Sequence, residues 1–166
     1  MLKKYLIVSF FITLFSINSQ AAGTATGTDD SSSKVKSNYD KAVSLIKQAK
    51  KYEKKGKTEK ANKKYEKAQK LLLKSNKKKP LQANTLNYLG FTTRKLGDYE
   101  NGEKYYLLGL EIDPNHKGIN EYLGELYVVT NRIDLAKERL NVLANCNCEE
   151  YGELKEIIDG TKQSKY

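Results

Sequence analysis

From residue 42 onwards, apolar and small residues recur at intervals of three and four along the chain. The first two runs are Val43, Ile46, Ala49 and Tyr52, then Ala61, Tyr65, Ala68 and Leu72. This spacing follows the 3.6-residue period of an α-helix and places these side chains on one helical face. Helix-forming residues fill the intervening positions, and glycine and proline occur where segments end. No stretch alternates as a β-strand does, so the pattern predicts an all-α fold.

The helical pattern repeats with a period of 34 residues. Gly90 and Gly124 are 34 residues apart, and each follows a leucine. The predicted turns at 96–98 and 130–132 align at the same spacing. An earlier turn glycine, Gly56, lies 41 residues before Gly97, so we expect the second helix of the first unit to be about two turns longer. The repeat therefore predicts three helix pairs, at about 38–79, 82–116 and 117–145.

Small residues occupy the positions where the two helices of each predicted pair would touch. They are Ala49, Gly90 and Gly124 on first helices, and Ala61, Gly102, Ala136, Ala68 and Gly109 on second helices. With its 34-residue period, this pattern resembles the tetratricopeptide-repeat (TPR) family. The resemblance covers about Ala42 to Ala144. It implies an all-α, right-handed solenoid of about three antiparallel helix pairs.

A short helical segment follows the third predicted pair. Tyr151, Leu154 and Ile157 or Ile158 have helical spacing, and acidic residues begin the segment. The last pair of a solenoid leaves an apolar face uncovered unless a further element covers it. We therefore expect residues 149–161 to form a capping helix.

The N-terminal segment has the order of a secretory signal peptide. Met1–Lys4 carries two lysines, Tyr5–Ile17 is almost wholly apolar and uncharged, and Ser19-Gln20-Ala21 follows with small residues at its ends. The apolar run is shorter than the roughly 20 residues that a spanning helix needs. We therefore predict a signal peptide at 1–21, with an uncleaved anchor or a buried helix as alternatives. Residues 22–37 are expected to form a flexible linker. The sequence therefore predicts an exported protein that is located in the periplasm, with secretion as the alternative.

Charge is distributed unevenly along the chain. Residues 34–79 hold 18 lysines against four acidic residues, whereas residues 80–166 hold 10 basic residues against 14 acidic ones. One interpretation is that the basic block faces a polyanion or an anionic membrane surface. The other is that the lysines form a solvated helix surface.

Candidate catalytic groups are few. The single histidine, His116, lies just after Pro114 in a turn between predicted pairs, where a polar surface role is expected. No glycine-rich phosphate loop and no metal-ligand spacing occurs. The sequence therefore predicts a protein that is not an enzyme, with no cofactor and no metal site.

The two cysteines, Cys146 and Cys148, are separated by one residue between the last repeat helix and the predicted cap. A local disulfide that anchors the cap is one interpretation, because an exported protein meets an oxidising compartment. Free buried thiols, an intermolecular bond, and a redox or soft-metal site are the alternatives, although two sulfurs alone make an incomplete metal site.

The resemblance also implies where a partner would bind. In TPR proteins the first helices of the pairs line a concave groove. Their groove positions correspond here to Ile46, Lys50, Glu53, Asn84, Asn87, Phe91, Arg94, Gly118, Glu121, Glu125 and Val128. Some TPR proteins clamp a peptide carboxylate with basic residues, but Glu121 and Glu125 would repel one here. We expect a mixed or basic segment with an apolar residue against Phe91. In an alternative, Arg94 pairs with Glu121 or Glu125.

These features predict a non-catalytic protein–protein interaction module, an adaptor or scaffold in the bacterial cell envelope. A segment of a partner would lie in the concave groove, at Lys50, Asn84, Asn87, Phe91, Arg94, Glu121 and Glu125. The main alternative is a polyanion or membrane-surface binder that uses the lysine-rich first helix pair. Nucleic acid is not an expected partner, because export separates the protein from it. The sequence leaves the partner and the oligomeric state open.

Overall fold

The computed structural model describes residues 36–164, and all the regular structure of this part of the chain is helical. The helices are α1 (Asn38–Glu53), α2 (Thr58–Lys78), α3 (Ala83–Lys95), α4 (Tyr99–Ile112), α5 (Lys117–Val129), α6 (Ile133–Leu143) and α7 (Glu149–Ile158). The predicted signal peptide, at 1–21, and most of the predicted linker lie outside the described residues.

Local signals in the sequence set where the helices begin and turn. Ser37 begins α1 with a capping box, because its hydroxyl accepts from the Asp40 N–H and the Asp40 carboxylate accepts from the Ser37 N–H. The turns inside the second and third pairs contain Gly97 and Asn131, with φ of 93° and 59°. Glycine and asparagine adopt this left-handed region most readily. The two residues are 34 positions apart, so the turn repeats with the period of the sequence.

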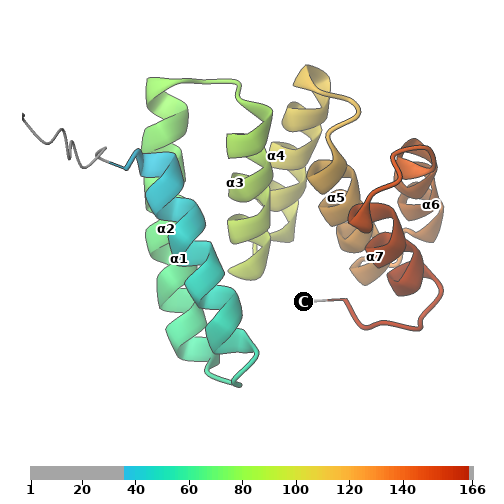
Figure 1. The fold of residues 1–166 in the computed structure, drawn as a ribbon, viewed down its shortest axis with the longest axis horizontal. Helices are drawn as coiled ribbons and strands as arrows, with labels where there is room; N and C mark the ends of the chain where they lie inside the picture. Colours follow the sequence, from blue (N-terminus) through green and yellow to red (C-terminus); the bar gives the residue numbers. More distant parts are fainter. Residues whose placement is uncertain (1–35, 165–166) are drawn as a thin grey trace, which may run out of the picture. The chain divides into compact units, whose positions relative to one another are not determined.

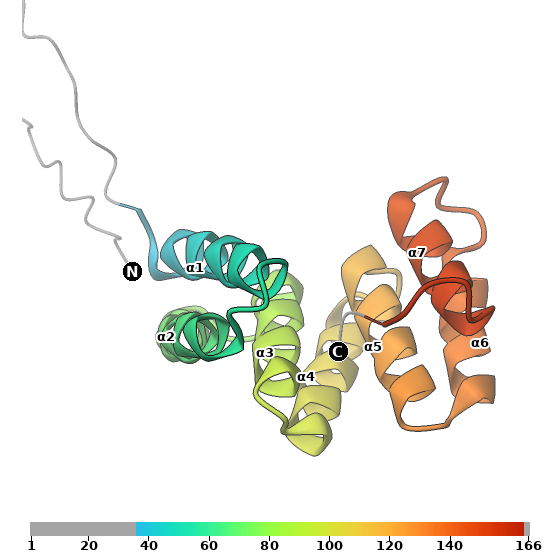
Figure 2. The ribbon, with the colours of Figure 1, turned by 90° about the horizontal axis from the view of Figure 1, so that it is seen from below.

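The helices form a stack of antiparallel pairs in which α1 packs on α2, α3 on α4, and α5 on α6. The first helices also contact one another across the stack, α1 with α3 and α3 with α5, whereas no contact joins α2, α4 and α6 within the described part. The stack therefore has an inner layer of first helices and an outer layer of second helices (Figures 1 and 2). The predicted fold class, a TPR-like solenoid of three helix pairs with a cap, is confirmed.

The first pair is longer than the second. Helix α2 has 21 residues and α4 has 14, a difference of about two helical turns. The extra length agrees with the wider interval between the turn glycines.

Glycines sit where neighbouring helices approach most closely. A Cβ added to Gly90 would lie 2.5 Å from the ring of Tyr106 in α4. At Gly109 it would lie 2.5 Å from Ile119, and at Gly124 it would lie 2.5 Å from Leu154 of α7. Since real Cβ atoms do not approach other atoms this closely, each glycine makes room for a buried side chain of a neighbouring helix. The alanines of the predicted contact pattern are buried as well.

The C-terminal helix α7 covers the end of the stack. It contacts both α5 and α6, and its Leu154 and Ile157 are buried. A disulfide between Cys146 and Cys148 closes the turn before it. None of the helices described here combines the length and apolar character that a membrane crossing requires.

Replacing Gly90 with alanine should destabilise the protein by about 1–3 kcal/mol, because the buried Tyr106 ring has to move. The matched control is Gly152→Ala in α7, where an added Cβ meets nothing within 4 Å. The control should stabilise the helix by about 0.5–1 kcal/mol, since alanine loses less backbone entropy than glycine. Urea unfolding of both variants measures the two effects. Equal stability of the two variants would contradict this account of the α3–α4 contact.

Candidate functional site

The groove residues predicted from the sequence lie on the three inner helices, but at different depths. Asn84 is exposed and Lys50 is partly exposed. Asn87 and Glu121 retain exposed fractions of 7% and 6%. Phe91, Arg94 and Glu125 are enclosed, with exposed fractions of 2%, 2% and 0%. Asn84 and Lys50 are therefore the most accessible of the seven residues, and Asn87 and Glu121 expose only a small part of their surface.

Arg94 joins α3 to α5 below the surface. Its Nη1 donates to the Tyr122 carbonyl oxygen at 2.6 Å, and its Nη2 lies 3.6 Å from a carboxylate oxygen of Glu125. Burial lowers the pKa of Arg94, an effect that Tyr106 and Glu125 oppose. The guanidinium nevertheless remains charged, because its ordinary pKa is very high. The alternative in which Arg94 pairs with Glu125 is thus confirmed, and the pair compensates two buried charges.

Phe91 is covered by other side chains of the protein. The ring packs against Tyr65 and Tyr122, with centroid distances of 5.8 and 5.1 Å. Lys50 places its Nζ 4.5 Å from the Phe91 centroid and donates to the Tyr122 hydroxyl at 3.3 Å. An apolar ligand residue could reach Phe91 only after Lys50 moved aside. The part of the predicted groove around Phe91 is therefore closed in this structure.

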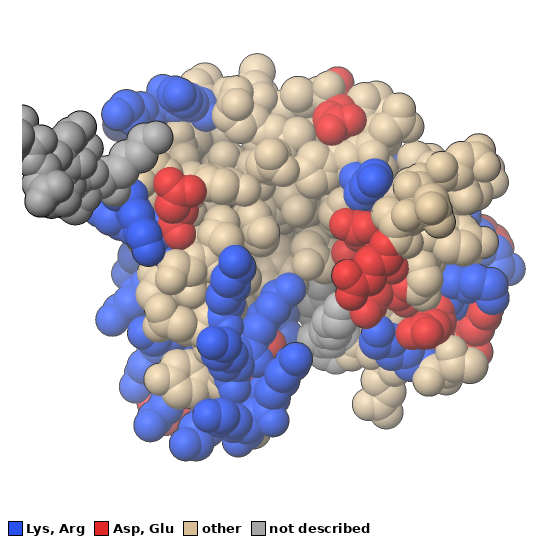
Figure 3. All heavy atoms as spheres, viewed as in Figure 1, with Lys and Arg blue, Asp and Glu red and all other residues tan. Residues whose placement is uncertain are grey.

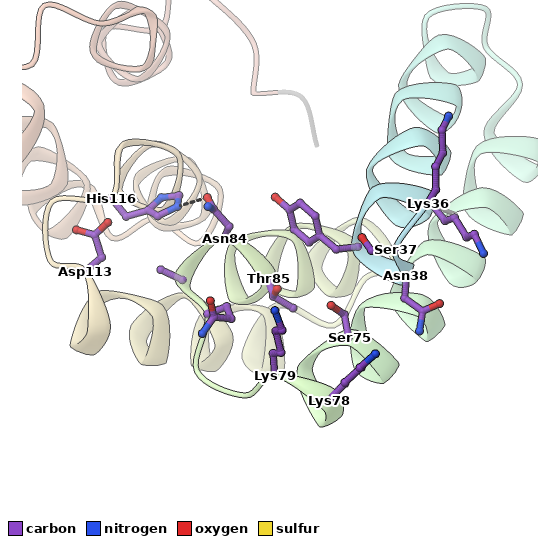
Figure 4. A pocket seen from close by; sticks show the side chains of 14 residues that line it. Lys36, Ser37, Asn38, Ser75, Lys78, Lys79, Asn84, Thr85, Asp113 and His116 are labelled. Atoms are coloured by element: carbon purple, nitrogen blue, oxygen red, sulfur yellow. Dashed lines mark hydrogen bonds between the residues drawn. The ribbon is translucent and has the colours of Figure 1, made fainter. Parts of the chain in front are cut away.

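The part of the inner surface near the helix ends is open and contains two adjoining hollows. The first, of about 720 Å³, lies among the ends of α1, α2 and α3 (Figure 4). Its lining residues are Lys36, Ser37, Asn38, Tyr39, Lys41, Ser75, Lys78, Lys79, Gln82, Ala83, Asn84, Thr85, Asp113 and His116. The second, of about 460 Å³, is lined by Asn87, Tyr88, Asp113, Asn115, His116, Lys117, Gly118, Glu121, Tyr122 and Glu150. Because they share Asp113 and His116, we call the two hollows together the helix-end groove.

His116 marks the boundary between the two hollows and begins α5. Its Nδ1 accepts the Ile119 N–H at 3.1 Å, and its Nε2 lies 2.9 Å from the Asn84 Oδ1 (Figure 4). Since Nδ1 accepts, the neutral ring carries its proton on Nε2 and donates to Asn84. Burial lowers the pKa of His116, although Asp113 and Glu150 oppose the shift. The ring thereby ties the start of α3 to the start of α5.

Asn87 is a polar side chain whose hydrogen bonding is incomplete. It lines the second hollow, and within the described residues its buried Oδ1 has no hydrogen-bond partner. Gly118 leaves room for the amide, because a Cβ there would lie 3.0 Å from the Asn87 Nδ2. An unsatisfied buried acceptor costs about 1–3 kcal/mol. An N–H group of a molecule in the adjoining hollow would offset that cost once the Asn87 side chain turned to expose its oxygen.

Of the seven residues predicted to bind a partner, Asn84, Asn87 and Glu121 line the helix-end groove, whereas Lys50, Phe91, Arg94 and Glu125 line neither hollow. Sequence reasoning missed the contributions of Lys78, Lys79 and Glu150. These residues come from helix ends outside the inner-helix positions that the repeat pattern marks. Within the described residues, no group of three or more His, Cys, Asp or Glu side chains could hold a metal ion.

Acidification should weaken folding through His116. Its pKa is lowered in the folded protein, so the unfolded chain binds the proton first, near its ordinary value of about 6.5. The contribution is complete above that pH and is lost as the pH falls through the lowered folded value. The control is His116→Asn, because asparagine can cap α5 without titrating. Unfolding free energies between pH 7.5 and 5 should fall more steeply in the wild type, and parallel curves would contradict the assignment.

Comparisons with known proteins agree with this architecture. The tetratricopeptide-repeat family model matches residues 83–116. The type III secretion translocator chaperone SycD of Yersinia enterocolitica is similar in structure, with TM-score 0.53 and 17% identity, over 83% of this chain and 93% of that one. Its alternative dimer gives TM-score 0.52 and 19% identity, over 76% and 91% of the two chains.

The first TPR domain of human RPAP3 has TM-score 0.46 and 20% identity, over 76% of this chain and 98% of that one. The comparison with curated protein sequences returns no match. At these identities, the SycD structures are evidence for the fold alone. Residues 83–116 are therefore a tetratricopeptide repeat, and the described chain has the fold of tetratricopeptide-repeat proteins.

Proposed function

We propose that this protein is a non-catalytic interaction module, an adaptor or scaffold, that binds an extended segment of a partner protein in the helix-end groove. The observation that carries the proposal is the position of Asn87. This residue lines the second hollow on the inner layer of the solenoid, and its buried amide oxygen has no hydrogen-bond partner within the described residues. A peptide main chain supplies N–H donors along its whole length.

The form of the groove suits an extended segment better than a compact ligand. Small-molecule sites are mostly apolar and enclosed, whereas both hollows are open and are lined mainly by residues with amide, hydroxyl or charged side chains. The hollows adjoin across the ends of successive helices, so the groove runs along the stack. Repeat proteins characteristically use such surfaces for recognition. For this protein, the inference of recognition rests on the residues that line the groove, and not on the fold alone.

We also propose that the module acts outside the cytoplasm, in the bacterial cell envelope or as a secreted protein. The predicted signal peptide at 1–21 supports this location. The disulfide between Cys146 and Cys148 is a second support, because disulfides persist in oxidising compartments and are rare in the cytosol.

The groove is tested by replacing Asn84 and Asn87 together with alanine. In-cell crosslinking of the full chain, followed by purification and quantitative mass spectrometry, compares the attached proteins. The recovery of specific partners with the double variant should fall at least about fivefold. This change corresponds to about 1 kcal/mol of binding free energy. The control is Asn141→Ala on the exposed surface of α6, which should retain them. Unchanged recovery from a double variant of normal stability would refute the groove assignment.

The exposed lysines of the first helix pair favour a second candidate function, binding to an anionic membrane surface. Lysines gather over α1 and α2 in the space-filling view (Figure 3). In α2 the exposed ones are Lys60, Lys63, Lys67, Lys70, Lys74, Lys77 and Lys78. A lysine close to an anionic leaflet contributes about 1 kcal/mol, so several together would hold the protein on a bilayer.

Sedimentation with phosphatidylserine-containing vesicles tests the second candidate. At low salt the wild-type chain should sediment with the vesicles, and it should be released at high salt because exposed charges are screened. The variant Lys67→Glu/Lys70→Glu should remain in solution at both salt concentrations. Neutral vesicles are the control surface. If the wild type does not sediment with anionic vesicles at low salt, this candidate is excluded.

A further inference from the structure

Charges of opposite sign line the two ends of the helix-end groove. Four lysines and one acidic residue line the first hollow: Lys36, Lys41, Lys78, Lys79 and Asp113. Three acidic residues and one lysine line the second: Asp113, Glu121, Glu150 and Lys117. The same segregation is visible in the space-filling view, where basic side chains gather over α1 and α2 and acidic ones over α5 and α7 (Figure 3).

Uncharged polar groups occupy the middle of the groove. Asn84, Asn87 and Tyr88 come from α3, and the neutral ring of His116 comes from the start of α5. Asn84 already accepts from the His116 ring, whereas the Asn87 Oδ1 has no partner within the described residues. The middle of the groove can therefore bind a main chain without regard to its direction, because a peptide offers N–H and C=O groups in both directions.

The charged ends remove that ambiguity. A segment that carries acidic residues at one end and basic residues at the other gains attraction at both ends in one direction and meets repulsion at both in the other. Each exposed charge pair contributes little by itself. Several pairs acting in the same sense nevertheless select between orientations and partners, because electrostatic complementarity governs specificity more than affinity.

We propose that the helix-end groove recognises a partner segment of dipolar charge, with acidic residues against Lys36, Lys41, Lys78 and Lys79 and basic residues against Glu121 and Glu150. This inference rests on the proposed function and adds to it the charge pattern and the direction of the bound segment.

A random peptide library tests the proposed charge pattern. Peptides of roughly 12 residues, about 40 Å when extended, are displayed and selected on the immobilised full chain at low salt. Asn84→Ala/Asn87→Ala identifies which selected peptides use the groove. Groove-dependent peptides should carry acidic residues toward one end and basic residues toward the other.

Charge-reversal variants then test which end of the groove holds the acidic residues. Lys78→Glu/Lys79→Glu should weaken a selected synthetic peptide about tenfold in fluorescence anisotropy at low salt. The matched control, Lys67→Glu/Lys70→Glu, changes the net charge equally at exposed positions of α2 that line neither hollow. It should change the dissociation constant less than about twofold. Glu150→Lys should weaken binding of the same peptide, because the new lysine repels the basic end of the peptide.

The outcomes separate the two proposals. Groove-dependent peptides without charge order, or equal effects of the two double lysine variants, would overturn the dipolar inference and leave the interaction function standing. The absence of any groove-dependent peptide would overturn both. Selected peptides whose binding falls with Lys78→Glu/Lys79→Glu and Glu150→Lys, and is retained in the matched control, would establish the direction of the segment.

Discussion

The close approach of helices at residues without large side chains is the constraint on which this structure depends. At Gly90, Gly109 and Gly124, the space that a Cβ would need is occupied by a buried side chain of a neighbouring helix. Larger residues would push α3 from α4, α4 from α5, and α5 from α7. Because each pair is antiparallel and the next pair repeats its packing, the first helices all begin at the same end of the stack. That common end carries the helix-end groove.

Packing also decides how much of the inner layer can bind a partner. Arg94 and Glu125 compensate each other's charge between α3 and α5, and Lys50 covers the ring of Phe91. Buried charges require such mutual compensation, so Arg94 and Glu125 contribute to the packing of the fold. The open surface is confined to the helix ends, where Asn84, Asn87 and Glu121 reach the two hollows.

Folding places the unevenly distributed charges of the chain on different surfaces. Lysines of the first pair contribute to two different surfaces: Lys78 and Lys79 line the groove, whereas Lys67 and Lys70 are exposed and line neither hollow. The acidic residues of the groove come from α5, α7 and the turn at Asp113. One sequence asymmetry therefore supports both a directional peptide site and a basic surface on the outer layer. The two proposed functions overlap in part, because Lys41 and Lys78 are exposed lysines of the first pair that also line the first hollow.

The sequence by itself determined the helices, their pairing and the capped solenoid. These features follow from local spacing: apolar residues recur at helical intervals, and Gly90 and Gly124 repeat at 34 residues. Only the tertiary structure decided which inner residues are accessible and which groups share the groove. Exposure of Phe91 depends on Lys50, 41 positions away in the sequence, and the acidic end combines Glu121 with Glu150 from another helix. Periodicity specifies which face of a helix a residue occupies, but depth and neighbours depend on the side chains that other helices bring to that face.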